Sequence, residues 1–206
     1  MLTVIVPATS QALTTLNAVK AELGLSGTGD DAWLADTIAR TSATIRRWCG
    51  RAFALETVRE SFRLPVSTEV LSLSRWPVVS VVSVTEDGDT LAPGAFETED
   101  DTGFVYRLTG SNSRRDWPAG KIVVEYRAGY VLPGNSDRTL PEDVEAACIA
   151  LCIRAFHAKG RDPALRSYQN PDVESYSLLD PDKTAMIDGL PADVAGRLWS
   201  YRPVVL

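Results

Sequence analysis

The chain has 206 residues, 45% of them hydrophobic, and a formal net charge of −6. This length and apolar content predict one sizeable core, so we expect a single domain that carries an arm. The acidic balance and the scattered Lys and Arg residues argue against a surface that grips DNA or RNA, because the phosphate backbone requires a dense basic footprint.

The cysteines and the apolar runs predict where in the cell the protein is made and whether it associates with a membrane. The three cysteines are an odd number without disulfide-like spacing, which predicts reduced thiols and a protein made in the cytoplasm. We expect no membrane association, since no apolar run approaches the length of a membrane span. The opening Met1–Pro7 lacks the basic region and the longer apolar run of a signal peptide.

Two helices are predicted in the first quarter of the chain. Thr14 or Thr15 caps a short helix that runs to Leu23. A longer helix follows, with Asp30 and Asp31 at its start and Gly50 as its left-handed stop. Its apolar stripe recurs every three or four residues, at Leu34, Ile38, Thr41, Ile45 and Trp48.

The sequence period then changes to two, which predicts β-structure over residues 53–131. The turn pair Asp87-Gly88 predicts a hairpin between two strands. We predict four main strands, at Thr57–Leu64, Val78–Thr85, Phe104–Leu108 and Lys121–Arg127. Together they indicate a small antiparallel sheet or barrel.

A third helix is predicted from Pro141 to Lys159-Gly160. We expect its buried stripe to comprise Val144, Cys148, Leu151 and Ala155. The following Leu165–Lys183 stretch is polar and mixed, with a short strand predicted at Val173–Ser177, and one more short helix is predicted at Pro191–Trp199.

No motif in the sequence predicts a catalytic, cofactor or metal site. Gly24, Gly27 and Gly29 lie in a turn between helices, and Asp30 and Asp31 occupy the helix start that would have to hold a phosphate. Cys148, Cys152 and His157 lie on nearby helix faces, but a structural zinc site needs a fourth ligand.

Acidic residues also gather in two clusters of the β region. Glu86–Asp89 is interpreted as a hairpin turn, and Glu97–Asp101 as a solvated loop without the ligand spacing of a calcium site.

The last eight residues are too apolar for a disordered terminus, which is normally poor in aromatic and β-branched residues. Arg202-Pro203 favours an extended backbone. We predict that this C-terminal segment docks a partner through Trp199, Tyr201, Arg202, Pro203, Val204, Val205 and Leu206.

The sequence resembles the head–tail connector (adaptor) proteins of tailed phages, which also occur in phage-derived gene transfer agents. The resemblance is carried in order by residues 6–34, Ile45–Arg51, Trp76–Val84, Val124–Tyr130, Leu140–Ala147, Glu174–Ser177 and Leu198–Arg202. The residues do not distinguish a phage from a gene transfer agent.

The resemblance implies a structural role without enzymatic activity or a cofactor. Such proteins form a ring, typically a dodecamer, beneath the portal protein and above the tail stopper, and DNA passes through the lumen. The location implied is the neck of a virion or virus-like particle, assembled in the cytoplasm of a bacterial host. An acidic protein suits a channel along which DNA slides without sticking.

We therefore expect an α+β fold: a helical bundle, an inserted antiparallel sheet or barrel, and an extended C-terminal arm. The expected divisions are helices at 14–50, the β insertion at 53–131, a helix at 140–160 and the arm at 161–206. The C-terminal segment is assigned to the portal, and Arg40, Arg46 and Arg47 on the long helix to contacts between subunits. The alternatives are a small enzyme with a carboxylate-based site in the β region, or a nucleic-acid-binding module.

Overall fold

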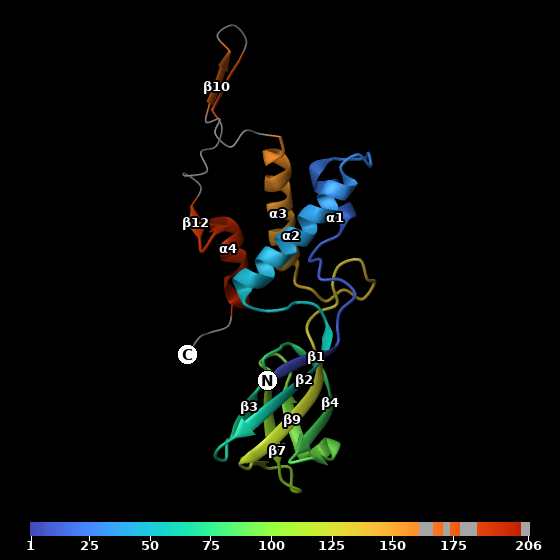
Figure 1. The fold of residues 1–206 in the computed structure, drawn as a ribbon, viewed down its shortest axis with the longest axis vertical. Coiled ribbons are helices and arrows are strands. Elements are labelled where there is room, and N and C mark those ends of the chain that lie inside the picture. The colour runs from blue at the N-terminus through green and yellow to red at the C-terminus, as the bar shows by residue number, and fades with distance from the viewer. Residues whose placement is uncertain (161–166, 171–173, 178–184, 203–206) are drawn as a thin grey trace. The chain divides into compact units, whose positions relative to one another are not determined.

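The computed structural model describes residues 1–160, 167–170, 174–177 and 185–202. The chain forms two compact units. One comprises residues 1–11 and 52–139, called here the β unit, and the other comprises residues 12–51 and 140–206, called here the helical unit. In the sequence, residues 52–139 of the β unit lie between the two segments of the helical unit, and residues 1–11 precede both segments (Figure 1).

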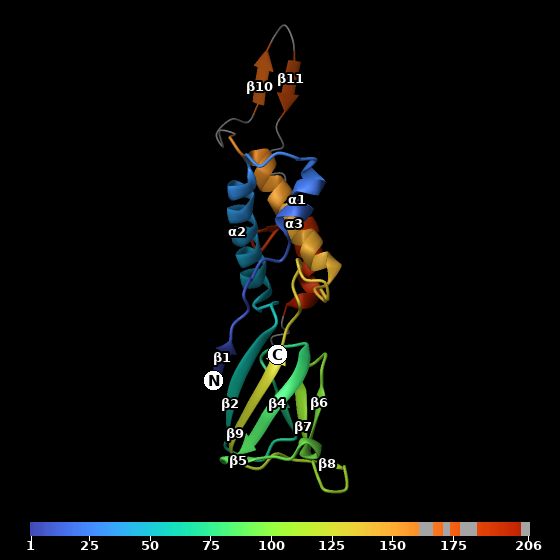
Figure 2. The same cartoon turned by 90° about the vertical axis from the view of Figure 1, so that its right-hand side faces the viewer.

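The larger sheet of the β unit is antiparallel throughout and has the order β1-β2-β9-β4-β5, of which Figure 2 shows β1, β2, β9 and β4 from left to right. Its strands are β1 (Leu2–Val6), β2 (Glu56–Leu64), β9 (Gly120–Ala128), β4 (Val78–Glu86) and β5 (Asp89–Thr90). Three of the four predicted main strands are therefore confirmed here. The sequence analysis missed β1, whose Met1 amine donates to the Ser61 carbonyl at 2.8 Å.

A second, smaller antiparallel sheet has the order β3-β7-β6, and β8 also pairs with β7. Its strands are β3 (Val70–Ser72), β6 (Phe96–Glu99), β7 (Phe104–Leu108) and β8 (Arg114–Arg115), and the one-turn helix η1 (Pro93–Ala95) precedes β6. The fourth predicted strand is thus confirmed as β7. The expected loop at Glu97–Asp101 was wrong in its first half, because Glu97 and Glu99 belong to β6.

Side chains from both sheets form one core in the β unit. Alternate residues of β9 point inward, with Val124 and Tyr126 fully buried, and Val105 of β7 meets them from the other sheet. Trp117 is also fully buried, and its indole N–H donates to the Val105 carbonyl at 3.0 Å. Within the described residues the sheets remain open. Of the two predicted alternatives, the structure therefore forms the antiparallel sheet and not the barrel.

A buried carboxylate, that of Glu60, lies within this core. Glu60 of β2 is 5% exposed and accepts hydrogen bonds from the Tyr126 hydroxyl at 2.9 Å and from the Ser74 amide at 2.9 Å, and the Ser74 hydroxyl is a third donor. Burial and the adjacent Glu60 raise the pKa of Tyr126. These bonds tie the segment before β4 to the middle of the larger sheet.

Three helices form most of the helical unit: α1 (Leu16–Leu23), α2 (Asp31–Cys49) and α3 (Glu142–Ala158). As predicted, Thr15 caps α1 by accepting from the Ala18 amide at 3.1 Å, and Gly50 ends α2 at a φ of +63°. The side chains of Thr41 and Ser42 on α2 contact the sulfurs of Cys148 and Cys152 on α3 at 3.3 to 3.5 Å.

The buried residues of α2 and α3 agree only in part with the predicted apolar stripes. On α3, Val144 and Cys148 are buried as expected, whereas Leu151 and Ala155 are half-buried. The remaining buried positions of α3 are Glu145, Ala147 and Cys152. On α2, Thr41 and Trp48 are half-buried, and the buried positions besides Leu34, Ile38 and Ile45 are Thr37, Ser42 and Cys49.

The rest of the helical unit contains short elements. Two antiparallel strand pairs are formed, β10 (Ser167–Asn170) with β11 (Glu174–Ser177), and β12 (Met186–Ile187) with β13 (Leu190–Pro191). They are followed by α4 (Ala192–Leu198) and the one-turn helix η3 (Trp199–Tyr201). The strand predicted at Val173–Ser177 is confirmed for β11, and the predicted last helix is α4. None of the helices in the described part of the chain combines the length and apolar character that a membrane crossing requires.

We predict that Tyr126→Phe lowers the free energy of unfolding of the β unit by about 1 to 2 kcal/mol, because a buried carboxylate loses a donor. The measurement is denaturant unfolding followed by tryptophan fluorescence. Tyr106→Phe on β7 is the matched control, since no hydrogen bond of its hydroxyl is formed with the described residues. Equal stability of Tyr126→Phe and Tyr106→Phe would contradict a structural role for the Glu60 hydrogen bonds.

Candidate partner-docking site

The described part of the C-terminal segment packs on the helical unit. Trp199 follows directly from α4 and stays 59% exposed, while its ring lies against that of Trp48, with 6.3 Å between centroids. The Trp48 indole N–H donates to the Ile187 carbonyl at 3.3 Å. Trp48 therefore anchors both the start of the C-terminal segment and the β12–β13 hairpin.

Arg202 is held from several sides. Its guanidinium lies over the Trp48 ring at 4.7 Å and near the Trp199 ring at 5.4 Å, and it pairs with the Asp188 carboxylate at 2.7 Å. Cation–ring contacts of this kind combine with the ion pair to fix the guanidinium. The hydroxyl of Tyr201 donates to the Asp143 carboxylate on α3 at 2.8 Å.

The structure thus brings together three of the seven predicted docking residues, Trp199, Tyr201 and Arg202. The expectation of an extended backbone was wrong for Trp199–Tyr201, which form the one-turn helix η3, whereas Arg202 has an extended backbone. The other four predicted residues, Pro203, Val204, Val205 and Leu206, lie outside the described residues.

A surface depression of about 550 Å³ lies beside this cluster. It is lined by Thr44, Arg47, Trp48, Asp188, Gly189, Leu190 and Arg202. Of the residues assigned to subunit contacts, Arg47 is exposed and lines the depression, and Arg46 is half-buried. Arg40 is exposed two turns earlier on α2, where its guanidinium donates to the Thr37 hydroxyl at 3.0 Å.

The thiol closest to this cluster is not a nucleophile. Burial raises the pKa of Cys49 to about 11, although Arg51 and Arg202 act in the opposite direction. A thiol with such a pKa is almost entirely protonated at neutral pH, and thiolate is the reactive form. The cluster of aromatic rings, guanidinium groups and two carboxylates is suited to binding a protein surface.

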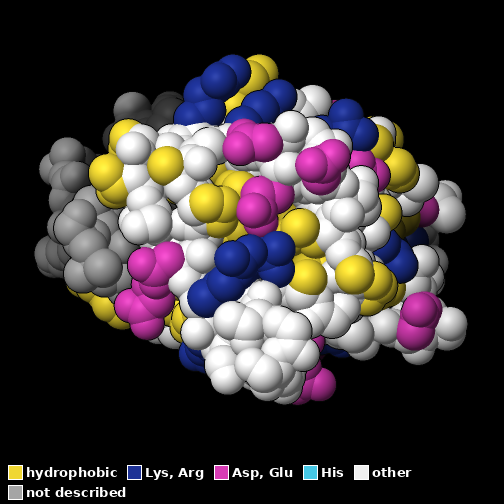
Figure 3. Space-filling model, turned by 90° about the horizontal axis from the view of Figure 1, so that it is seen from below, with side chains coloured by type: hydrophobic (Ala, Val, Ile, Leu, Met, Phe, Trp, Pro, Cys, Tyr) yellow, Lys and Arg dark blue, Asp and Glu magenta, His cyan; other side chains and the backbone are white. Residues whose placement is uncertain are grey.

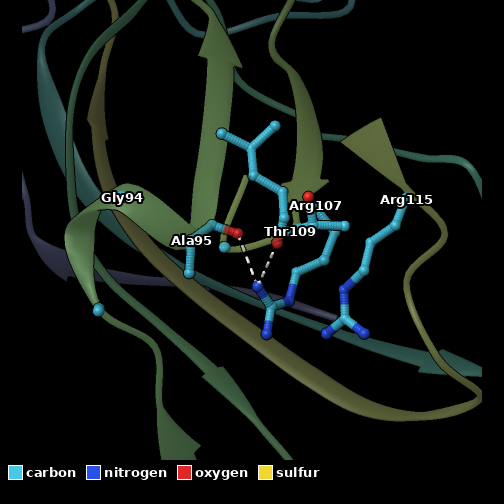
Figure 4. A pocket seen from close by; sticks show the side chains of 8 residues that line it. Gly94, Ala95, Arg107, Thr109 and Arg115 are labelled. Carbon is cyan, nitrogen blue, oxygen red and sulfur yellow. Dashed lines mark hydrogen bonds between the residues drawn. The ribbon is translucent and has the colours of Figure 1, made fainter. Parts of the chain in front are cut away.

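Neither of the two pockets described in the β unit is lined by two carboxylates. A pocket of about 460 Å³ is lined by Arg107, Arg115 and neutral residues (Figure 4). Arg107 is occupied by the Ala95 carbonyl at 2.7 Å and the Glu86 carboxylate at 2.9 Å. A further pocket near Pro7 and Tyr130 has a single carboxylate, Asp137.

Metal binding finds equally little support, since among the described residues no group of three His, Cys, Asp or Glu side chains could hold an ion. Cys148 and Cys152 are buried in the helical core, as the sequence indicated.

Basic side chains are dispersed and paired. In Figure 3, Lys and Arg side chains alternate with acidic and apolar ones over the face shown. In the β unit, Arg59 pairs with Glu125 at 2.8 Å and Arg114 with Glu97 at 3.2 Å. Pairing reduces the positive potential that a phosphate backbone would meet, so this surface lacks the footprint of a nucleic-acid-binding module.

The sequence did not indicate three contributors to the cluster: Trp48 was assigned to the core stripe of α2, Asp143 only to the charge at the start of the third helix, and Asp188 was given no role. Asp188-Gly189 is the same turn signal that was interpreted correctly at Asp87-Gly88, and Asp188 indeed has a positive φ of 49°. The hairpin could therefore have been predicted. Its contact with Trp48 depends on tertiary packing, which leaves no local signal.

Comparisons with known proteins place these features in a wider context. A family model described as "Head completion protein" matches residues 12–160. A comparison with curated protein sequences found no match.

Three solved structures similar to this chain come from gene transfer agent (GTA) particles. The chain resembles a chain in the neck of an empty GTA particle computed with C6 symmetry, with a TM-score of 0.59 and 17% identity. It also resembles a chain in the neck of a native GTA particle computed with C12 symmetry, with a TM-score of 0.60 and 15% identity. A third, from the virion of a native gene transfer agent (GTA) particle, has a TM-score of 0.59 and 18% identity. Each alignment covers 100% of this chain and 97% of the other, and at these identities the likeness concerns the fold.

We predict that Trp48→Ala accelerates amide hydrogen exchange in α4 by about fivefold or more, because the ring and cation contacts that hold the C-terminal segment are lost. Hydrogen exchange with mass spectrometry measures this directly. Trp33→Ala is the control, since Trp33 is near the other end of α2, where it contacts Phe156 at 6.0 Å between ring centroids. Unchanged exchange in α4 of Trp48→Ala would show that Trp48 is not the anchor.

Proposed function

This chain belongs to the head completion protein family, and from that premise we propose that it forms a ring between the portal protein and the tail stopper of a phage or gene transfer agent particle. The family is structural and not enzymatic. The family match over residues 12–160 is the observation that carries the proposal. In this function the chain acts in the particle neck, after assembly in the cytoplasm of a bacterial host, and DNA passes through the lumen of the ring.

The likeness to neck chains supports a ring of twelve copies. The similar structures were computed with C6 and C12 symmetry, and a dodecamer is compatible with both. In such a ring each subunit uses two different surfaces, one for each neighbour, and every surface is occupied once the ring closes. Arg40, Arg46 and Arg47 on α2 are proposed to take part in these contacts, since Arg40 and Arg47 are exposed and Arg46 is half-buried.

The C-terminal segment is proposed to bind the portal protein. Trp199 offers an exposed aromatic surface, and the contacts of Tyr201 and Arg202 fix the point from which Pro203–Leu206 continue. Fixing this starting point reduces the entropy that a short peptide loses on binding. The composition Pro203-Val-Val-Leu206 suits an extended strand that adds to a sheet of the partner.

Passage of DNA fits the charge of the chain. The net charge of −6 and the paired arginines give the DNA backbone few sites at which to stick. No pocket described above favours the enzyme alternative, so a structural conduit is the function that the geometry supports best.

We predict that deletion of residues 203–206 leaves a folded protein but prevents the joining of heads to tails. The folded state is retained because the contacts of Tyr201 and Arg202 remain. Electron microscopy counts tailed particles, and circular dichroism checks the fold. Val66→Ala, a change at an exposed residue outside the strands, is the control expected to retain tails. Normal tailing of the truncated variant would refute the assignment of these residues to portal binding.

We further predict negligible binding of double-stranded DNA by the purified protein, even at about 50 mM salt, where backbone contacts are strongest. A fluorescence anisotropy titration with labelled duplex is the measurement. Binding that weakens steeply as salt is raised would instead favour the nucleic-acid-binding alternative.

A further inference from the structure

We propose that neighbouring copies of this chain contact each other through opposite edges of the larger sheet, with β1 of one copy lying antiparallel beside β4 of the next. The inference rests on the proposed ring and specifies one of its subunit interfaces. It concerns Leu2–Val6 on β1 and Val79–Ser83 on β4.

Both edges are open within the described residues. β1 is the first strand in the sheet order and pairs only with β2. On β4, β5 covers Thr85 and Glu86, and the Leu91 amide donates to the Val84 carbonyl at 2.8 Å. At the start of β4 the Val78 amide donates to the Asp100 carbonyl at 2.7 Å, so the open part of this edge is Val79–Ser83. Met1 and Ser61 exchange two backbone hydrogen bonds. Because hydrogen-bonded and non-hydrogen-bonded pairs alternate along an antiparallel ladder, Leu2 and Val4 direct their backbone N–H and C=O groups away from β2.

Exposed apolar side chains are concentrated on these edges. Ten large hydrophobic residues are exposed in the described part of the chain, and five of them lie on these two strands. They are Val4, Ile5, Val6, Val79 and Val82. Val79 is 52% exposed and Val82 is 56% exposed, and apolar surface of this kind is typical of an interface.

The charge pattern of the sheet agrees with this assignment. Neither Leu2–Val6 nor Val79–Ser83 contains a charged residue. The strands between them carry charges on the outer face, including the Arg59–Glu125 pair. The apolar and uncharged edges therefore match each other in chemistry and differ from the face between them.

The edges of the smaller sheet show the protection that β1 and β4 lack. A free edge is normally protected by shortness or by charge. β3 has only three residues, and β6 carries Glu97 and Glu99, which pair with Arg114 at 3.2 and 3.5 Å. The contrast within one unit indicates that the edges of the larger sheet are left open for contact.

The strand directions permit a head-to-tail contact. β1 runs antiparallel to β2, β2 to β9 and β9 to β4, so β1 and β4 of one copy run in opposite directions. Neighbours in a large ring differ by a small rotation, so β1 of the next copy reaches β4 in the antiparallel orientation. Such a contact uses two different surfaces and closes on itself.

Bulges limit how strongly the edges pair. The β4–β9 register shifts at Val79 and at Val82, and the β1–β2 register shifts at Ile5. A bulge interrupts the ladder and discourages unlimited strand addition. The contact therefore depends mainly on apolar side chains, with backbone pairing near Leu2 and Val4.

Paired cysteines test the contact in assembled particles. Thr3, Ser80 and Ser83 face the outer side of the sheet, opposite Arg59, Arg127 and Glu125 respectively. We predict that Thr3→Cys combined with Ser80→Cys or Ser83→Cys gives a ladder of disulfide-linked multimers, measured on a non-reducing gel after mild oxidation of purified particles. The Cβ atoms of directly opposed residues in an antiparallel pair lie ~4.5–5.5 Å apart, which is close enough for a disulfide. The three native cysteines are buried and should not cross-link.

The control is Thr3→Cys combined with Ser72→Cys, because Ser72 is an exposed serine on the edge strand β3 of the other sheet. It should give no ladder. If both double-cysteine variants are incorporated into necks yet give no disulfide-linked multimers, the contact does not exist. Dimers formed by Thr3→Cys alone would show a twofold β1–β1 contact and overturn the proposal. Absence of the wild-type chain from purified particles would refute the proposed function itself.

Introduction of a charge on the β4 edge provides a second readout. Val82→Lys places an unpaired charge in the contact and should reduce incorporation into necks by about tenfold. Val66→Lys is the matched control, since Val66 is 66% exposed outside the strands. Equal incorporation of the two variants would contradict the role of β4.

Discussion

The close antiparallel contact between α2 and α3 is the constraint on which the helical unit depends. Almost a hundred residues of sequence separate the two helices, and small side chains at Thr41, Ser42, Cys148 and Cys152 allow them to approach. At one end Lys159 pairs with Asp30 at 2.5 Å. At the other end the contact brings the last turn of α2 beside the first turn of α3.

That second end is where the C-terminal segment is held. Trp48 at the end of α2 supports Trp199 and Arg202, and Asp143 at the start of α3 accepts from Tyr201. Arg154 on α3 also pairs with Asp193 on α4 at 2.7 Å. The candidate docking site is therefore a product of the helix–helix contact, and a substitution that separated α2 from α3 would disturb it without touching any docking residue.

Much of this fold could be predicted, because the local signals agree with the tertiary structure. Helix caps at Thr15 and Gly50 and the period of two in β2, β4, β7 and β9 are encoded within a few residues of sequence. β1 was missed because Leu2–Val6 is apolar without alternation, as a strand with both faces partly exposed can be. The candidate docking residues were selected by their composition, but composition does not reveal that Trp199 and Arg202 contact their own subunit. That contact needs Trp48 and Asp188, which only the fold brings together.

The position of the first residue has a practical consequence. The amine of Met1 donates to the carbonyl of Ser61, so a purification tag fused there would replace the charged amine beside this edge of the sheet. A tag at the other terminus would extend the segment proposed to reach the portal. The turn at Gly110–Ser113, which is exposed and lies between β7 and β8, is the better place for an inserted label in imaging of the intact particle.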